Sequence, residues 1–298
     1  MITFTVLAVL FTFASMTRAA HAPVGLGTAD TFAVLGGATV TNTGPTVISG
    51  DLGVSPGSAV TGFPPGLVNN GSIHAANAVA TQAQSDLTTA YNDAAGRTCT
   101  SDLTGIDLGT QTLTDGTYCF SSSAQLTGTL TLDGQGNPNA VFIFQIGSTL
   151  TTASASTVSL INGAQACNVY WQVGSSAVLG TTTTFRGSIL ALTSISLNTG
   201  ATIVEGRALA RNGAVTLDTN TITRDTCRTT APAPTAAPTT APSGGTTATP
   251  APVTTVPNTG VAETIDAGGD KLILVGIAAG LVGLFALTLL RRQFVRGA

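Results

Sequence analysis

Several threonines in the second half of the chain recur at a nearly constant spacing. The sequence separation from Thr183 to Thr202 equals that from Thr202 to Thr221. The separation from Thr199 to Thr219 is one residue longer. Each side chain offers a methyl group and a hydroxyl, which both donates and accepts hydrogen bonds. If the repeats stack as β-strands, the two sets form neighbouring columns with a step of about 4.8 Å. A flat grid of this kind suits a partner that is itself a repeating lattice.

The same pattern occurs near the start of the chain. Residues 42–50 read NTGPTVISG and residues 198–206 read NTGATIVEG, so Thr43 and Thr46 correspond to Thr199 and Thr202. Asn and Gly tolerate the positive φ angles that tight turns require. Each segment therefore predicts a turn followed by a strand.

Short strands in a regular repeat could position these threonines. Placing Gly187 over Gly206 pairs Phe185 with Val204, and further along it pairs Ile189 with Ala208, Leu190 with Leu209 and Ala191 with Ala210. Upstream, FQIGS at residues 144–148 returns as WQVGS at residues 171–175, which predicts a core position for Trp171. Strands and turns that recur with such a short period are typical of a β-solenoid, in which each coil pairs with the coils above and below it.

One helix is expected beside these strands, at about residues 75–95. Small and apolar residues recur there at steps of three and four, and Gly96 follows as a C-terminal stop. The predicted apolar face consists of Ala76, Val79, Ala83, Leu87, Ala90 and Ala94.

The composition argues against two classes of function. Only 8% of the 298 residues are charged, the net charge is -3, and the one lysine is Lys271. Nucleic acid is not expected as a partner, because no basic surface is available to neutralise phosphates. A carbohydrate-active β-helix enzyme is a disfavoured alternative, because such enzymes need clustered carboxylates and the acidic residues here are scattered.

The chain contains four cysteines, Cys99, Cys119, Cys167 and Cys227. An even number in an exported chain favours two disulfides, and the sequence allows three pairings. We expect Cys99 to pair with Cys119 and Cys167 with Cys227. No two cysteines form a CxxC motif, and neither histidine lies among the threonine repeats, so no metal or other cofactor is expected.

Residues 1–22 resemble a secretory signal peptide. An apolar run from Ile2 to Phe13 is followed by small residues. No basic residue precedes the run, and Pro23 follows the best small-residue cleavage site. An uncleaved N-terminal anchor is therefore the alternative.

The composition changes after the predicted domain at residues 23–228. Residues 229–255 are rich in Thr, Pro and Ala without apolar periodicity, and predict an extended linker that could reach on the order of 80 Å. Residues 272–290 are uncharged and would form a helix of about 28 Å, enough to cross a bilayer. Arg291, Arg292 and Arg296 follow, which predicts a cytoplasmic tail and places the domain at the cell surface.

Between the linker and this span stand Val256, Pro257, Asn258, Thr259 and Gly260. With the hydrophobic stretch and basic tail that follow, VPNTG resembles a sortase cell-wall sorting signal, whose pattern is Leu-Pro-x-Thr-Gly. The resemblance implies cleavage after Thr259, with sortase and peptidoglycan as partners. Val256 stands in place of leucine, and the alternative is an ordinary turn in a stalk that ends in a membrane helix.

Three segments and the predicted helix together resemble the ice-binding protein family of bacteria, fungi and microalgae, over nearly all of residues 29–222. The segments are residues 32–63, residues 141–154 with VFIFQIGSTLTTAS, and residues 168–222, which begin NVYWQVGSS. The resemblance implies a mostly β fold, a right-handed discontinuous β-solenoid of triangular section with one long α-helix packed alongside. It also implies that the N-terminal coils lie next to the C-terminal ones, and that one flat face binds ice.

Some members of that family carry a Thr-Ala/Gly-x-Thr/Asn motif on the ice-binding face. Residues 43–46 and 199–202 match the motif, and Thr183, Thr219 and Thr221 are assigned to the same face by their spacing. The hypothesis is adsorption to ice through ordered hydroxyl and methyl groups. A cell-surface adhesin that binds polysaccharide or host glycans through this face is the alternative.

Overall fold

The structure is a computed structural model that describes residues 21–224 and residue 227. These residues belong to one compact unit, Met1–Thr235. The predicted linker, sorting motif and membrane span lie outside the described residues, as does all but the end of the predicted signal peptide. Within the described residues, no helix has the length and apolar character needed to cross a membrane.

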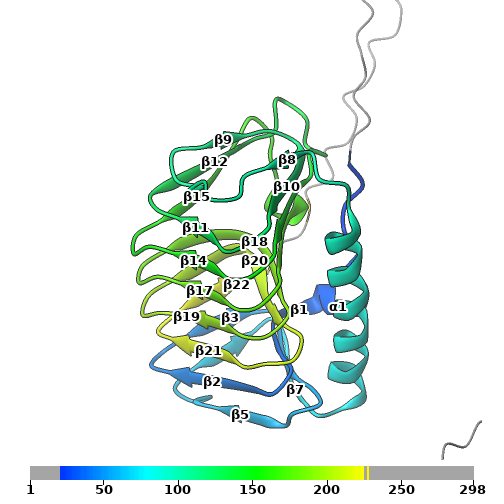
Figure 1. Cartoon of the computed structure of the whole chain (residues 1–298). Helices are drawn as coiled ribbons and strands as arrows, with labels where there is room; N and C mark the ends of the chain where they lie inside the picture. The colour runs from blue at the N-terminus through cyan, green and yellow to red at the C-terminus, as the bar shows by residue number, and fades with distance from the viewer. Residues whose placement is uncertain (1–20, 225–226, 228–298) are drawn as a thin grey trace, which may run out of the picture. The chain divides into compact units, whose positions relative to one another are not determined.

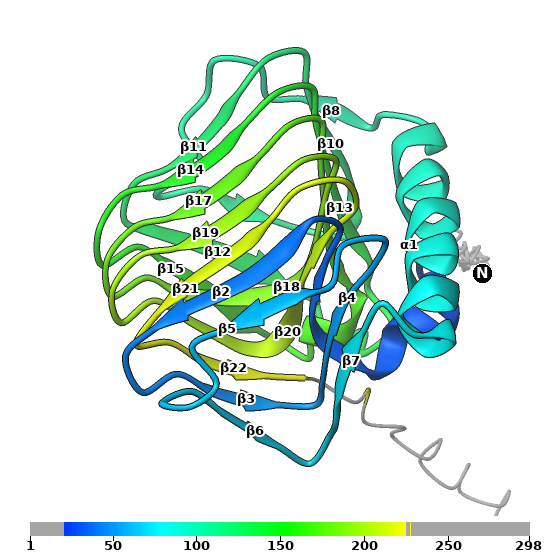
Figure 2. The same ribbon diagram turned by 90° about the horizontal axis from the view of Figure 1, so that it is seen from below.

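The strands form a stack of coils in which every pairing is parallel, and three ladders of strands surround one apolar core (Figures 1 and 2). Two of the ladders belong to one 15-stranded sheet, which bends at β18 and β20. The first half of each of these two strands lies in one ladder and the second half in the next.

The first ladder lies beneath the helix. Its strands, in spatial order, are β7 (Ile73–Ala75), β4 (Asp51–Val54), β1 (Phe32–Gly36), the second half of β20 (Thr202–Ala210), the second half of β18 (Thr184–Ala191), β16 (Val169–Val173), β13 (Phe142–Ile146), β10 (Gly116–Phe120) and β8 (Ser101–Asp102).

The second ladder contains the first halves of β20 and β18. Around them its order is β6 (Leu67–Asn69), β3 (Val47–Ser49), β22 (Thr221–Thr223), β20, β18, β15 (Thr157–Ile161), β12 (Thr129–Asp133) and β9 (Thr112–Leu113).

The third ladder is the separate seven-stranded sheet. Its order is β5 (Ala59–Thr61), β2 (Thr39–Thr43), β21 (Val215–Asp218), β19 (Ile195–Leu197), β17 (Ala177–Leu179), β14 (Leu150–Thr152) and β11 (Ala124–Leu126). Two short 3₁₀ helices complete the fold, η1 (Gly27–Thr31) and η2 (Ala166–Asn168).

As the family resemblance implied, the coils are stacked in an order that differs from their order along the chain. β2 and β3, near the start of the domain, pair with β21 and β22, near its end. β1 likewise pairs with β20. The NTG segment at residues 42–44 therefore lies next to coils from the far end of the domain.

The helix α1 (Ala78–Gly96) covers the first ladder (Figure 2). Asn77 caps its N-terminus by accepting a hydrogen bond from the Ala80 amide at 3.0 Å. Its buried face is Ala80, Ala83, Leu87, Ala90, Tyr91 and Ala94. The prediction for Ala76 and Val79 is wrong, because Ala76 precedes the cap and Val79 is 47% exposed at the first turn.

The repeated glutamines of FQIGS and WQVGS attach the helix to this ladder. Gln145 donates to the carbonyl oxygens of Ala94 and Arg97 at 2.8 and 2.7 Å, which satisfies groups left free at the end of a helix. Gln172 donates to the Tyr91 hydroxyl at 2.8 Å. On the inner side of the same strands, Phe144 and Trp171 stack with ring centroids 3.9 Å apart. Trp171 is fully buried, as predicted.

The repeat alignment holds after the bend but not before it. Gly187 lies opposite Gly206, and the pairs from Ile189 to Ala191 are as predicted. Phe185, however, pairs with Ile203 rather than Val204. The register shifts between these pairs because β20 carries one extra residue at the bend, where Glu205 adopts a φ of 58°.

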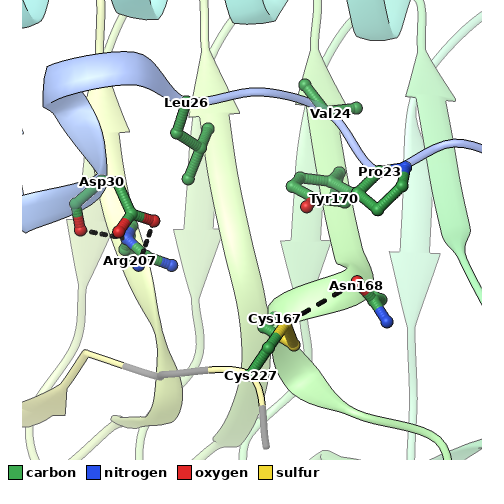
Figure 3. A pocket seen from close by; sticks show the side chains of 9 residues that line it. All are labelled: Pro23, Val24, Leu26, Asp30, Cys167, Asn168, Tyr170, Arg207 and Cys227. Atoms are coloured by element: carbon green, nitrogen blue, oxygen red, sulfur yellow. Dashed lines mark hydrogen bonds and ion pairs between the residues drawn. A yellow bond between two sulfur atoms is a disulfide. The ribbon is translucent and has the colours of Figure 1, made fainter. Parts of the chain in front are cut away.

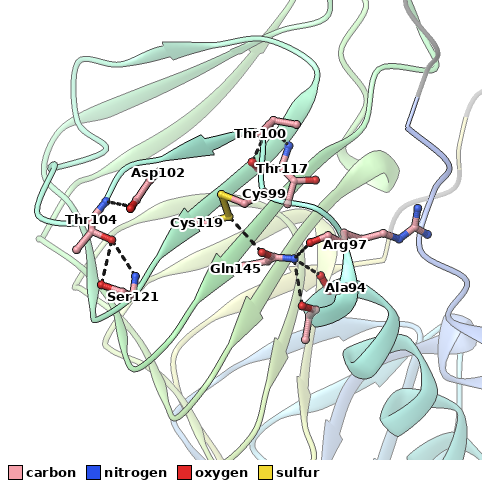
Figure 4. Close-up of a disulfide and its surroundings, with 11 residues drawn as sticks. Ala94, Arg97, Cys99, Thr100, Asp102, Thr104, Thr117, Cys119, Ser121 and Gln145 are labelled. Atoms are coloured by element: carbon pink, nitrogen blue, oxygen red, sulfur yellow. Dashed lines mark hydrogen bonds between the residues drawn. A yellow bond between two sulfur atoms is a disulfide. The ribbon is translucent and has the colours of Figure 1, made fainter.

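Both expected disulfides are present. The Cys167–Cys227 disulfide joins η2 to the last described residue (Figure 3). The Cys99–Cys119 disulfide joins the segment after α1 to β10 (Figure 4).

Candidate functional site

The second ladder carries a column of threonines on its outer surface. Thr129 lies opposite Thr157, which lies opposite Thr184, followed in register by Thr202 and Thr221. Val47 and then Leu67 continue the column on β3 and β6. Five successive coils thus present a threonine at the same position. We call the outer surface of this ladder the threonine face and these five residues its central column.

The alternation of a β-strand directs these side chains outward. The next residue on each strand is buried in the core, namely Leu130, Val158, Phe185, Ile203 and Ile222. Two positions along, Thr131 lies opposite Ser159, and Thr223 lies opposite Ser49. These four side chains add small hydroxyl groups beside the central column.

A corner column borders the threonine face where each coil turns from the third ladder into the second. Its members are Ser154, Thr181, Thr199, Asp218 and Thr43. The backbone amide that follows each of the first four donates to the carbonyl oxygen of the member in the next coil, at 2.9 to 3.1 Å. The residue that follows each member has a positive φ, at Ala155, Thr182, Gly200, Thr219 and Gly44. The coils therefore turn in the same way, and glycine is the residue best suited to this position.

Five of the seven predicted threonines lie on or beside this surface. Thr202 and Thr221 belong to the central column. Thr43 and Thr199 are exposed in the corner column, and Thr219 is exposed at the turn that follows it. Thr199 and Thr219 do not form a column of their own, because Asp218 occupies the position beside Thr199.

The predicted outward position of Thr46 and Thr183 is wrong, because both side chains are fully buried. The outward positions belong to the residues that follow them, Val47 and Thr184. The alignment of Gly187 with Gly206 places Thr183 beside Thr202, because it ignores the extra residue in β20 at Glu205. With that residue taken into account, Thr184 lies opposite Thr202. In the N-terminal coil, Gly44, Pro45 and Thr46 all belong to the turn, so the strand begins one residue later than the motif suggests.

Sequence reasoning missed Thr129, Thr157 and Thr184. The coils that carry Thr129 and Thr157 are longer than those that carry Thr202 and Thr221, so a search at a fixed period passes over them. The signal that could find them is local, namely a polar residue followed by a β-branched or apolar core residue directly after each turn.

The threonine face is uncharged at its centre. The nearest described ion pair lies at the bend, where Arg186 and Glu205 are 2.7 Å apart. In the corner column, Asp218 accepts hydrogen bonds from the Thr199 and Thr219 hydroxyls at 2.5 and 3.0 Å. The carboxylate is therefore bound to neighbouring threonines within the corner.

The other two ladders differ in how far they are open to solvent. The first is covered by α1, whereas the third is open (Figure 2). The column on the outer surface of the third ladder is Gln125, Thr151, Val178, Ser196, Thr216, Thr41 and Thr61. This outer surface has fewer threonines in unbroken register than the threonine face. Variants on this outer surface can therefore serve as controls for variants on the threonine face.

One cavity of about 320 Å³ lies away from both open ladders, beside the Cys167–Cys227 disulfide (Figure 3). Pro23, Val24 and Leu26 form an apolar wall. Arg207, only 2% exposed, is bound to Asp30 at 2.7 Å and to the Ser188 hydroxyl at 3.2 Å. These contacts attach the N-terminal segment to the solenoid. The described residues hold no group of three or more His, Cys, Asp or Glu that could bind a metal.

Known proteins share this architecture. The family model described as Ice-binding-like matches residues 34–223. An ice-binding protein of Nostoc sp. (strain HG1) is 64% identical over 197 residues, which cover 66% of this chain and 72% of that protein.

Two crystal structures extend the comparison. That of an ice binding protein from an Antarctic Biological Consortium has a TM-score of 0.67 and 50% identity, over 72% of this chain and 96% of that one. That of an ice-binding protein from the Antarctic ascomycete Antarctomyces psychrotrophicus has a TM-score of 0.67 and 43% identity, over 69% of this chain and 100% of that one. Together with the family match, these similarities show that the chain belongs to the ice-binding-like family.

Proposed function

We propose that this protein adsorbs to ice through the threonine face. The observation that carries the proposal is the central column, in which five threonines from five successive coils lie in direct register on an open ladder. The relatives named as ice-binding proteins support it.

The chemistry of the face suits a crystalline partner. Neighbouring coils repeat at about 4.8 Å and alternate residues along a strand at about 6.7 Å, so the hydroxyls and methyls form a two-dimensional grid. The hydroxyls can hold water molecules in fixed positions, and the methyls limit the alternative positions of that water. The ordered layer then merges with the surface of the crystal. Each contact is weak, but a rigid scaffold engages many of them without a large ordering cost.

A non-catalytic role agrees with the contacts of the acidic residues. Asp86 accepts from the Thr28 amide and hydroxyl, both at 2.7 Å. Asp107 accepts from the Gly109 and Thr127 amides, both at 2.8 Å. These carboxylates stabilise turns and the attachment of the helix, whereas an acid–base pair would need two carboxyl groups directed at one substrate position.

Adsorption of the purified protein to an ice hemisphere tests the proposal. The protein should be incorporated into growing ice at well above its level in the liquid, and should not bind chitin, cellulose or host glycans in pull-down assays. Trp171 is buried in the core, so it cannot act as a stacking platform for sugars. Glycan binding without incorporation into ice would contradict the proposal and support the adhesin alternative.

We also propose that the domain acts outside the cell, held at the surface by its C-terminal region. The support is the order of linker, VPNTG motif, apolar stretch and basic tail in the sequence. The two disulfides fit an oxidising compartment. Protease treatment of intact cells should release the domain. In a host with sortase, Thr259→Ala should move the protein from the wall fraction to the membrane fraction, and an unchanged distribution would favour a membrane stalk.

A further inference from the structure

Polar side chains lie in the interior directly beneath the corner column. Thr46, Thr152, Ser156, Thr183 and Asn220 are at most 3% exposed, although the surrounding core is apolar. A buried hydroxyl or amide is unfavourable unless it is hydrogen bonded. We call these five residues the buried polar ladder.

Four of the five stand immediately before an outward residue of the threonine face. Ser156 precedes Thr157, Thr183 precedes Thr184 and Asn220 precedes Thr221. Thr46 likewise precedes Val47. In the central column, Thr202 and Thr129 lack such a neighbour, because Ala201 precedes Thr202 and Gly128 precedes Thr129. The buried polar ladder therefore lies one residue away from the surface proposed to meet ice.

Thr152 and Thr183 complete a chain of hydrogen bonds between two coils. The Gly180 amide donates to Thr152 Oγ1 at 2.8 Å, and the Thr152 and Thr183 hydroxyl oxygens are 2.8 Å apart. Thr183 donates to the Ala153 carbonyl oxygen at 3.1 Å, so the Thr152 hydroxyl donates to Thr183. The chain joins the coil of β14 and β15 to that of β17 and β18 at the turn before Thr184.

Asn220 makes the corresponding connection further down the stack. Its Nδ2 donates to the carbonyl oxygens of Asn198 and Ala201 in the coil above, at 3.0 and 2.9 Å. Its Oδ1 accepts from the Asp218 amide at 2.7 Å. Its own amide donates to Thr46 Oγ1 at 3.0 Å, in the coil below. One side chain and its amide thus bind three coils at the corner.

Ser156 closes the upper end of the ladder. It donates to the Leu126 carbonyl oxygen at 2.9 Å and accepts from the Gly128 amide at 3.3 Å, both in the coil above. Apolar side chains in these places would fill the space but would not fix the direction of the turn, because dispersion contacts have little directionality. Hydrogen bonds constrain distance and angle.

We propose that the buried polar ladder, and Thr183 and Asn220 in particular, consists of positioning residues for ice adsorption. These side chains hold successive turns in one orientation, so that the outward threonines keep the spacing that an ice lattice requires. The inference rests on the proposed function of the threonine face. None of the buried residues touches ice, and their effect is transmitted through the backbone to the residue that follows.

The test is Thr183→Val, which keeps the branched shape and removes the hydroxyl. Thr183→Ser is the conservative variant, because it restores the hydroxyl. Ile143→Val is the matched control, since Ile143 is fully buried in the layer between the first ladder and α1, away from the threonine face. All three variants should keep the far-ultraviolet circular dichroism spectrum and both disulfides.

Thr183→Val should lower thermal hysteresis about twofold or more at equal concentration, because an interrupted hydrogen-bond chain leaves the turn before Thr184 less constrained. Thr183→Ser should retain most of the activity, and Ile143→Val should retain it even where its melting temperature falls as far. A double variant, Thr152→Val with Thr183→Val, should lose less activity than the sum of the two single losses, because both residues belong to one chain of hydrogen bonds.

The outcomes separate the two proposals. If the wild type fails to adsorb to ice, the proposed function is wrong and the inference fails with it. If the wild type adsorbs and Thr183→Val matches Ile143→Val, the buried polar ladder has only a structural role and this inference alone is overturned. The same conclusion follows if Thr183→Ser loses as much activity as Thr183→Val.

Discussion

Val47 lies directly opposite Thr221 in the parallel pairing of β3 with β22, although the two residues come from opposite ends of the domain. Val47 therefore occupies the position at which the central column would have its sixth threonine. The column breaks because the coil that supplies this position has a valine, with the same shape as threonine but no hydroxyl.

Replacing Val47 by threonine should extend the central column by one coil. The hydroxyl would lie at a partly exposed position, so the change should alter the free energy of unfolding by less than about 0.5 kcal/mol. Thermal hysteresis should rise, since a longer ordered array makes more contacts with the crystal. Val178→Thr on the third ladder is the matched control, and it should leave hysteresis unchanged. Equal gains from both variants would argue against a role specific to the threonine face.

The Cys167–Cys227 disulfide should contribute strongly to stability. It closes a loop with a sequence separation of 60 residues, for which the loop-entropy estimate is about 4 kcal/mol. Replacing both cysteines by serine should lower the free energy of unfolding by up to that amount in denaturant titrations. The corresponding change at Cys99 and Cys119, separated by 20 residues, should cost about 3 kcal/mol. No loss in either variant would show that the oxidised state contributes little to the fold.

Stability should also depend on Asp86, which joins α1 to the N-terminal segment. The hydrogen bond from the Thr28 amide, helped by that from the Thr28 hydroxyl, holds the pKa of Asp86 below its ordinary value of 3.8. A depressed folded-state pKa stabilises the protein above the unfolded-state pKa, and this contribution is lost as the pH falls through the folded-state value.

The melting temperature of the wild type should therefore be higher than that of Asp86→Asn above about pH 5, with the difference shrinking below about pH 4. Thermal unfolding followed between pH 3 and pH 7 measures this, and Asp133→Asn serves as a control at a turn away from the helix. A difference between wild type and Asp86→Asn that grows on acidification would contradict the assignment.

The sequence predicted some parts of the fold well because they depend on local regularity. The pairing of Phe144 with Trp171 follows from two copies of a short apolar strand at constant offset. The helix from Ala78 to Gly96 follows from its three- and four-residue period. Its buried face begins at Ala80, later than predicted, because Asn77 is the N-cap and the helix starts after it. The placement of β2 and β3 beside β21 and β22 came from the family resemblance, because contacts between distant coils leave no local pattern.

The candidate site was harder to predict than the fold. The extra residue at Glu205 lies within β20 and shifts the register of the first half of this strand relative to its second half. A shift of one residue is enough to move a side chain from the outer surface to the core. Thr183 was assigned outward for this reason and Thr46 because its turn is one residue longer than the motif suggests, while each in fact belongs to the buried polar ladder. Residue type does not resolve the choice, since the same coils carry threonine both in the core and on the outer surface, as Thr183 and Thr184 show.

Adsorption through the threonine face is tested most directly by thermal hysteresis and ice shaping, measured for Thr202→Tyr and Thr216→Tyr side by side. Thr202 is in the central column, whereas Thr216 is exposed on the third ladder, and both variants should keep the circular dichroism spectrum of the wild type. Thr202→Tyr should abolish ice shaping, because the bulky ring holds the crystal away from the neighbouring threonines, while Thr216→Tyr should leave ice shaping intact. Full activity in Thr202→Tyr, or its loss only in Thr216→Tyr, would contradict adsorption through the threonine face.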